Sequence, residues 1–287
     1  MKIFHKGFNY SQDGQGNRLV LHLQGCNMRC PWCANPEGIS MKGTLVTHDK
    51  PLIDALCPKG AIVDGKLNRK ICETCTTHDC VTKTPNTLMH MSCKDYTIDE
   101  LVDLAVQSKP MFFDGGGVTV SGGEPTLQFE ELMELLKRLQ EVGINTAIET
   151  NATNKRLPEL IPYLDYFIID LKNANSEQLK AITGVSAEII KENIRYIAKN
   201  HKNVLIRTPL VHNFNDSEEN LKEFIDFCKT IDSLDVKFEF LQFHEFSLSK
   251  WRQSGMEYTM VDGHLPKGRV EEFEKAFKEN NLKTIRT

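Results

Sequence analysis

The spacing of the cysteines constrains this chain more than any other feature. Nine cysteines occur among 287 residues, and eight of them lie between Cys26 and Cys93. In a reducing compartment, such a cluster favours metal binding over disulfide formation. The odd total also argues against a fully paired set of disulfides. We therefore expect the fold to contain at least one metal centre.

The composition is that of a soluble globular protein. Hydrophobic residues make up 40% and charged residues 26% of the chain. Lys plus Arg total 35 and Asp plus Glu total 39, a formal charge of -4, which disfavours broad binding to nucleic acid. No apolar run approaches the roughly 20 residues that span a bilayer, and the first residues lack the apolar stretch of a secretory signal. We expect a cytoplasmic protein with no membrane or nucleic-acid partner.

Short apolar runs alternate with amphipathic helical patterns through most of the chain. Such runs, bounded by turn residues, are typical of buried strands. The six expected strands are Arg18–Gly25, Gly117–Ser121, Asn145–Thr150, Tyr166–Leu171, Asn203–Leu210 and Val236–Phe243. The expected helices are one starting near Thr97, Glu130–Val142, Glu188–Lys199, Glu218–Thr230 and Arg269–Asn280. Glu100, three residues after Thr97, is typical of a capping box.

Strand and helix alternation predicts an α/β fold with a parallel sheet and helices outside it. Six βα units favour an incomplete barrel, although a doubly wound open sheet gives the same pattern. Residues 46–95 break the rhythm, since they contain five cysteines and no long helical pattern. We interpret them as a small insertion that needs a metal centre to fold. The expected organisation is residues 1–45 and 96–287 for the barrel and 46–95 for the insert.

The first expected strand ends in a loop with the spacing CxxxCxxC, formed by Cys26, Cys30 and Cys33. Three thiolates on one tight loop can hold three irons of a [4Fe-4S] cluster, which leaves the fourth iron open to a small molecule. A zinc knuckle or free thiols are the alternatives. The carboxyl end of a strand is where barrel enzymes keep their chemistry, and this position favours the cluster.

Further motifs follow in order along the chain. They are Asp13-Gly14-Gln15-Gly16-Asn17-Arg18, the block GGGVTVSGGEP from Gly115 to Pro125, Asp170-Leu171-Lys172, RTPLVHNFND from Arg207 to Asp216, and His244 followed by Lys250-Trp251 and Gly255-Met256-Glu257-Tyr258. With the cysteine loop, this set resembles the radical S-adenosylmethionine (SAM) superfamily, and within it the activating enzymes of glycyl radical enzymes. The match is to the pyruvate formate-lyase activase branch, with Gln15 and Asn17 departing from the usual DGPGxR. The resemblance runs nearly end to end and implies a partial (βα)6 radical SAM barrel with a small ferredoxin-like iron-sulfur insertion.

The resemblance implies a reaction and a set of cofactor contacts. The open iron would chelate SAM, and the reduced cluster would cleave it to methionine and a 5′-deoxyadenosyl radical that abstracts hydrogen from a glycine of the partner. Cys26, Cys30 and Cys33 would then be catalytic as well as metal ligands. The residues implied in SAM binding are Trp32, Cys33 and Ala34 near adenine, Gly122, Gly123 and Glu124 at the amino group, Asp170, Leu171 and Lys172, with Lys172 near the carboxylate, and His244 at the nucleoside.

Each of these sites also has a structural interpretation. Gly122 to Glu124 can be a simple strand-to-helix turn, and Asp170 and Lys172 face the same side of a strand, where they can form a core ion pair. Arg207 lies in an apolar strand, so we expect it to pair inward with a carboxylate or with the SAM carboxylate. The resemblance also allows a monovalent cation beside SAM, but Glu149 stands where a shorter Asp is usual.

The insert resembles a bacterial ferredoxin that has lost the ligands of one of its two clusters. Many activases of this group carry two CxxCxxCxxxCP runs, and the fourth cysteine of each run ligates the cluster of the other. Here the first run keeps only Cys57, and the second keeps Cys72, Cys75 and Cys80. The resemblance therefore implies one auxiliary [4Fe-4S] cluster held by these four residues. Cys93 is the alternative fourth ligand, and a zinc site is the alternative centre.

Two other functions compete with activation of a glycyl radical enzyme. A radical SAM enzyme acting on a small molecule would share the barrel, but the combined motifs disfavour it. A ferredoxin-like electron carrier or a zinc-binding interaction module explains neither the barrel motifs nor a cysteine loop that lacks a fourth ligand. The resemblance also implies flavodoxin or ferredoxin as the electron donor. The sequence does not identify which glycyl radical enzyme is the partner.

Overall fold

Parallel strands form the centre of the molecule and follow one another in sequence order. The computed structural model describes residues 1–75, 77–233 and 235–287. Within these ranges, one sheet has the order β12-β11-β10-β9-β8-β2-β1-β7. Its parallel strands are β2 (Asn17–Leu23), β8 (Gly117–Gly122), β9 (Thr146–Thr150), β10 (Tyr166–Asp170), β11 (Val204–Leu210) and β12 (Val236–Gln242). β1 (Lys2–Tyr10) is antiparallel to β2, and β7 (Lys94–Asp95) is antiparallel to β1.

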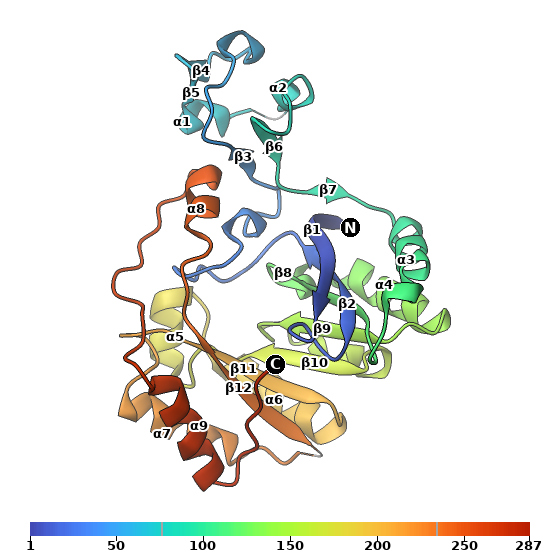
Figure 1. Cartoon of the computed structure of the whole chain (residues 1–287), viewed down its shortest axis with the longest axis vertical. Coiled ribbons are helices and arrows are strands. Elements are labelled where there is room, and N and C mark those ends of the chain that lie inside the picture. The colour runs from blue at the N-terminus through green and yellow to red at the C-terminus, as the bar shows by residue number, and fades with distance from the viewer. Residues whose placement is uncertain (76, 234) are drawn as a thin grey trace.

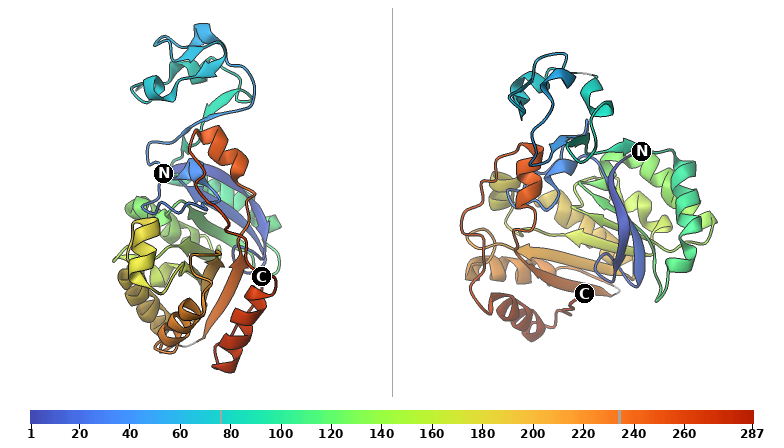
Figure 2. Two further views of the ribbon diagram at one scale, coloured as in Figure 1. Left: turned by 90° about the vertical axis from the view of Figure 1, so that its left-hand side faces the viewer. Right: turned by 45° about the horizontal axis from the view of Figure 1, so that its top comes forward.

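The strand order decides between the two architectures that the sequence left open. A doubly wound sheet reverses its order at a switch point. Here each parallel strand lies beside the next one along the chain, from β2 to β12. Helices line one side of the curved sheet (Figures 1 and 2). The partial (βα)6 barrel is therefore confirmed.

The helices pack their apolar faces against the outside of the sheet. They are α3 (Ile98–Gln107), α4 (Phe129–Glu141), α5 (Ser176–Thr183), α6 (Glu188–Asn200), α7 (Glu218–Cys228) and α9 (Arg269–Glu279). All but α5 were predicted near these bounds, and Thr97 and Glu100 form the predicted capping box. β1 was missed because its sequence, KIFHKGFNY, mixes charged and apolar residues and one strand face is partly exposed.

Alternation along the strands gives the barrel a polar interior. Apolar residues such as Leu21 and Val120 pack in the main core, and their strand neighbours point the opposite way. Those neighbours include Arg18, Thr119, Glu149, Asp170, Arg207 and Glu239. Arg18 is buried and donates to Thr119 Oγ1 at 2.6 Å and to Asn145 Oδ1 at 2.9 Å. The interior therefore offers polar groups to a bound molecule.

A separate small unit stands at one end of the barrel (Figures 1 and 2). Its elements are β3 (Leu45–Thr47), β4 (Ile62–Val63), β5 (Lys66–Leu67), α1 (Arg69–Cys72), α2 (Asp79–Thr82) and β6 (Met89–Met91). β3 pairs with β6 and β4 with β5, apart from the main sheet. Their buried core contains Leu45, Leu52, Ile62, Cys80 and Met89. These elements fall in or next to residues 46–95, and the bounds of the insert stay a prediction.

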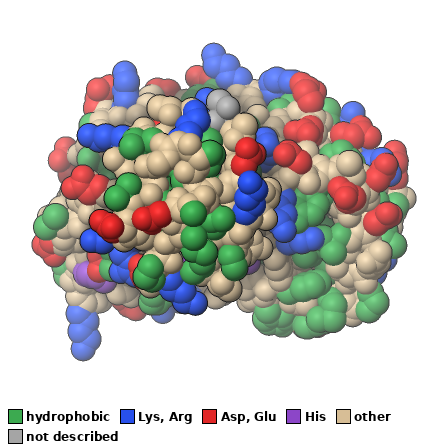
Figure 3. Space-filling view, turned by 90° about the horizontal axis from the view of Figure 1, so that it is seen from above, with side chains coloured by type: hydrophobic (Ala, Val, Ile, Leu, Met, Phe, Trp, Pro, Cys, Tyr) green, Lys and Arg blue, Asp and Glu red, His purple; other side chains and the backbone are tan. Residues whose placement is uncertain are grey.

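Charges of both signs are interspersed on the face seen from above, over the insert (Figure 3). Lys and Arg side chains lie among Asp and Glu on this face, so no single basic surface dominates it. This fits the small net charge of the chain. Among the described helices, none is both long and apolar enough to cross a membrane.

Candidate radical SAM site

The cysteine loop is fixed at the carboxyl end of β2 by backbone bonds. Gly25 N donates to Gly38 O at 2.7 Å, and Cys26 N donates to Ile39 O at 2.9 Å. Gly25 has a φ of +105°, and a Cβ there would lie 1.8 Å from Met41 Sδ. Glycine is therefore required at the point where the strand turns into the loop.

The three thiols of the loop are held in a largely buried setting. Burial raises the pKa of Cys26 to about 11 and that of Cys30 to about 12, and it also raises the pKa of Cys33. Backbone amides donate to two of the sulfurs, from Met28 N to Cys26 Sγ and from Asn35 N to Cys33 Sγ, both at 3.4 Å. Such thiols lose their protons when they bind a metal centre.

These features fit an iron-sulfur cluster. Amide donors to sulfur tune clusters of this type, and each thiolate of a cubane binds a different iron. In the described part of the chain, no three His, Cys, Asp or Glu side chains converge as they would around one metal ion.

The SGGE turn after β8 packs against the base of the loop. Gly123 N donates to Leu23 O at 2.9 Å, and Glu124 N donates to Gly25 O at 2.6 Å. A Cβ at Gly123 would lie 2.1 Å from Gly25 O, and one at Gly122 would lie 2.2 Å from Leu23 N. The glycines are thus required by the close approach of two strand ends.

Glu124 is fully buried and its carboxylate is already satisfied by the protein. It accepts from Thr126 Oγ1 at 2.6 Å, Thr150 Oγ1 at 2.8 Å and Asn151 N at 2.7 Å. Burial raises the pKa of Glu124, and these donors act against the rise. Its side chain joins the ends of β8 and β9, so only the backbone of this turn remains available to a ligand.

Asp170 is the last residue of β10, Lys172 lies just beyond it, and the two form an ion pair of 2.5 Å. Burial lowers the pKa of Lys172, but Asp170 and the Cys30 thiol outweigh it, so the net shift is upward. The Lys172 charge in turn acts to lower the pKa of Cys26, Cys30 and Cys33, against the effect of burial. The structure therefore brings this pair to the cysteine loop, while the buried Leu171 points into the main core.

Arg207 pairs inward with carboxylates, one of the two outcomes expected for it. It bonds Glu149 Oε1 at 2.6 Å and Glu239 Oε2 at 2.8 Å. The other oxygen of Glu149 accepts from Ser121 Oγ at 2.7 Å. Burial raises the pKa of Glu149 to about 7, although Arg207 acts in the opposite direction. The sequence analysis missed Glu239, whose signal was a lone carboxylate inside an apolar strand.

The predicted adenine and nucleoside contacts lie at the rim of this region. The Trp32 ring packs against Phe214 with centroids 4.6 Å apart, and Ala34 is exposed. His244 is also exposed and stacks on Phe246 at 4.5 Å. Ala34 and His244 are thus open to a ligand, whereas Trp32 is half-buried and packs against the main core.

Helix α8 (Leu248–Ser254) holds the cysteine loop from its other side. Trp251 Nε1 donates to Cys33 O at 2.9 Å, and Lys250 Nζ donates to Asn35 Oδ1 at 2.7 Å. The sequence contained the Lys-Trp motif, but nothing in it indicated that these side chains reach back to the loop. The late motif thus has a positioning role at the first cysteines.

Four cysteines of the insert lie near one another and the fifth lies apart, although in the part of the chain that the structure describes no three of them converge as they would around one metal ion. Burial raises the pKa of Cys80, and the nearby thiols of Cys57 and Cys75 add to the rise. Burial likewise raises the pKa of Cys72, with Cys80, Cys75 and Cys57 adding to it. Ala61 N donates to Cys57 Sγ at 3.2 Å. Cys93 lies next to β7, where its charged neighbours are Lys2 and Asp95.

Comparison with known proteins identifies the family. Residues 20–225 match the Radical SAM superfamily. The 4-hydroxyphenylacetate decarboxylase activating enzyme of Clostridioides difficile (strain 630) is 35% identical, over 94% of this chain and 90% of that protein. The choline trimethylamine-lyase activating enzyme of Oleidesulfovibrio alaskensis is 32% identical, over 86% and 84%. A solved domain of pyruvate-formate lyase-activating enzyme from Bacteroides vulgatus ATCC 8482 is 27% identical, with a TM-score of 0.50, over 60% of this chain and 98% of that one. The chain belongs to the radical SAM superfamily and, within it, to the activating enzymes of glycyl radical enzymes.

Proposed function

We propose that activation of the partner takes place where the cysteine loop meets the carboxyl ends of β8, β9 and β10. The observation that carries this proposal is the convergence of Lys172 and the SGGE turn on Cys26, Cys30 and Cys33. When bound, a [4Fe-4S] cluster supplies the electron that cleaves SAM to methionine and a 5′-deoxyadenosyl radical, which takes a hydrogen atom from a glycine.

The side chains around the loop bind and orient SAM in this proposal. Lys172 offers its ammonium group to the SAM carboxylate, and the backbone carbonyls of the turn at Gly122 and Gly123 accept from the SAM amino group. Trp32 and His244 supply flat surfaces for the nucleoside. Glu124 keeps the turn in place through its bonds to β9. Enclosure by these groups keeps water from the reacting atoms.

We infer that the insert holds one auxiliary [4Fe-4S] cluster through Cys57, Cys72, Cys75 and Cys80. The thiols of Cys57 and Cys75 raise the pKa of both Cys72 and Cys80, which supports the set, as does the amide donated to Cys57. The position of Cys93 near Lys2 and Asp95 argues against its use as a ligand.

The residues at the end of β9 do not fit a monovalent cation. Both oxygens of Glu149 are engaged, one by Arg207 and one by Ser121. The guanidinium already places a positive charge where a cation would be held. We therefore propose that this chain works without one at Glu149.

A flavodoxin or ferredoxin is the proposed electron donor, and the cytoplasm is the proposed location. The partner is a glycyl radical enzyme.

The proposal is tested by mixing the reconstituted protein anaerobically with SAM, a reductant and a purified glycyl radical enzyme encoded nearby. We expect a glycyl radical signal by electron paramagnetic resonance, with one 5′-deoxyadenosine formed for each radical. Consumption of SAM together with a small-molecule substrate, and no glycyl radical, would favour the competing small-molecule enzyme.

A further inference from the structure

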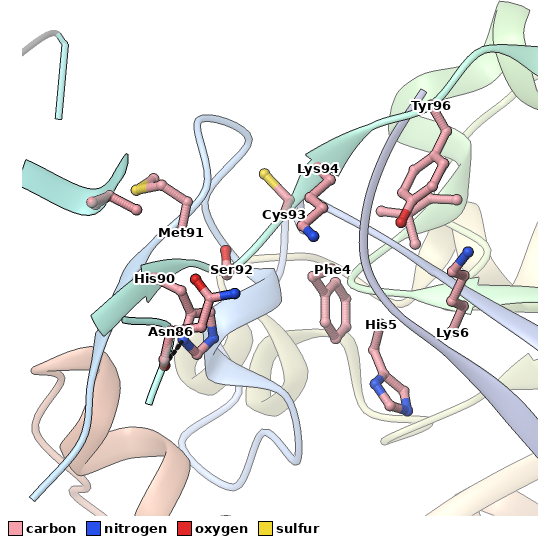
Figure 4. Close-up of a pocket in the computed structure, with 12 residues that line it drawn as sticks. Phe4, His5, Lys6, Asn86, His90, Met91, Ser92, Cys93, Lys94 and Tyr96 are labelled. Carbon is pink, nitrogen blue, oxygen red and sulfur yellow. Dashed lines mark hydrogen bonds between the residues drawn. The ribbon is translucent and has the colours of Figure 1, made fainter. Parts of the chain in front are cut away.

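The insert meets the barrel differently on its two sides. On the side of β1, a cavity of about 500 Å³ lies between that strand and the segment that ends the insert (Figure 4). Phe4 and His5 line one wall of this cavity, and His90 and Cys93 line the other. On the side of α8, by contrast, the Arg69 side chain lies directly against the end of the helix. The insert is therefore seated on α8.

Arg69, the first residue of α1, makes this contact through its guanidinium group. Its Nη1 donates to Leu45 O at 2.8 Å, and its Nη2 donates to Gln253 O at 2.7 Å and to Thr47 Oγ1 at 3.1 Å. Thr47 Oγ1 in turn donates to Gln253 O at 3.3 Å. These bonds join β3 of the insert to the last turn of α8, which lies beside it (Figure 1).

Gly255, from the late sequence motif, makes room for the guanidinium. It ends α8 with a φ of +68°, and a Cβ at this position would lie 1.7 Å from Arg69 Nε. The positive φ and the close approach both require glycine here. One residue of that motif is thus fitted to a side chain of the insert.

The same helix carries the contacts to the cysteine loop. Trp251, which is buried, donates from Nε1 to Cys33 O, and Lys250 donates from Nζ to Asn35 Oδ1. Gln253 follows Trp251 by only two residues. Because packed elements transmit displacement with little compression, a shift of α8 at its contact with the insert also moves the indole that holds the loop.

We propose that Arg69 is a positioning residue for the cysteine loop, which it reaches through α8. The guanidinium fixes the last turn of the helix, and the helix fixes the carbonyl of Cys33 through Trp251. The insert thereby supports the SAM site mechanically, apart from any electron transfer or docking. The inference rests on the proposed function, in which the loop holds the cluster that binds SAM.

The test compares Arg69→Met with Arg252→Met in the reconstituted full chain. Arg252 also joins α8 to the insert, but through an exposed ion pair with Asp49 at 2.6 Å, so it is the matched control. The readouts are calorimetric titration with SAM and hydrogen exchange at Cys33 and Asn35, whose amides are bonded within the loop.

For Arg69→Met we expect exchange at these two amides to become about tenfold faster and SAM affinity to fall about fivefold. For Arg252→Met we expect both quantities to stay within about twofold of the wild type. Unchanged exchange and affinity in Arg69→Met would overturn the proposal, because Arg69 would then only hold the insert. Equal changes in both variants would overturn it as well.

Thr47→Val is a second, milder variant that removes one acceptor of Arg69 and one donor to Gln253 O. It should change exchange and affinity in the same direction, by less, with the iron content unchanged. If Arg69→Met loses the irons of the insert, Thr47→Val decides the question, and an unaltered loop in it overturns the proposal. Failure of the wild type to form 5′-deoxyadenosine with dithionite would instead refute the proposed function.

Discussion

The cysteine loop and the insert both gather thiols, but they rest on very different amounts of buried structure. The loop is tied by backbone bonds to the ends of β2 and β8, and its Met28 and Cys30 belong to the main core. In the insert, Cys80 is itself a member of a small core, against which Cys57 and Cys72 pack. A core of that size rarely supports a fold without a staple. The loop should therefore survive without metal, whereas the insert should depend on it.

The largest expected effect is on SAM chemistry when a loop cysteine is removed. Cys26→Ala leaves the loop without one of its three ligands, and reductive cleavage of SAM should become undetectable. Because the loop is held by the barrel, the variant should still fold and keep the insert's irons. Cys228→Ala, which alters the buried cysteine of α7, is the matched control. Normal 5′-deoxyadenosine formation by Cys26→Ala would remove the loop from the reaction.

The second largest effect should be on the insert when iron is removed, because the insert and the barrel should then differ in hydrogen-exchange protection. Chelation under anaerobic conditions should leave the main sheet protected from hydrogen exchange and open the insert, because its core needs the cluster. We expect protection in the insert, from β3 to β6, to fall by about 100-fold or more relative to β8 and β9. Equal protection of both regions in the iron-free protein would contradict the contrast drawn above.

Lys172→Met should have a smaller effect, confined to ligand binding. The loss of one charge-assisted contact should weaken SAM binding by about tenfold. Asp170 is partly exposed, so its loss of a partner should lower the melting temperature only slightly without SAM. Calorimetric titration with SAM and a thermal melt measure the two quantities. Unchanged affinity with a large drop in melting temperature would make the pair a structural one.

The smallest expected effect is on stability, in the variant Trp251→Phe. It removes the indole donor to Cys33 O and leaves that carbonyl without this partner. We expect the free energy of unfolding to fall by about 1 kcal/mol. Denaturant titration of the barrel measures it, with Trp32→Phe as a matched control that removes an indole elsewhere. An equal loss in the control would mean that ring packing, and not the hydrogen bond, matters.

Features that depend on local sequence could be predicted, whereas contacts between distant segments could not. Buried parallel strands read as continuous apolar runs, so their positions were predicted within a few residues, and the cysteine loop carries its own spacing. The partners of Arg207 could not be predicted, because they depend on which strands are neighbours. Arg207 is in register with Glu239 only once β11 and β12 are paired. The bonds from Lys250 and Trp251 to the loop likewise depend on how a distant helix packs.

The ligand set of the insert tests the central claim most directly. We would count iron in anaerobically reconstituted protein with Cys26, Cys30 and Cys33 replaced, and then add either Cys57→Ala or Cys93→Ala. The account predicts about eight irons in the wild type, about four in the triple variant and about four again with Cys93→Ala. With Cys57→Ala, the remaining cluster should be unstable and the count should fall well below four. A cluster that survives the loss of Cys57 but not the loss of Cys93 would contradict the account.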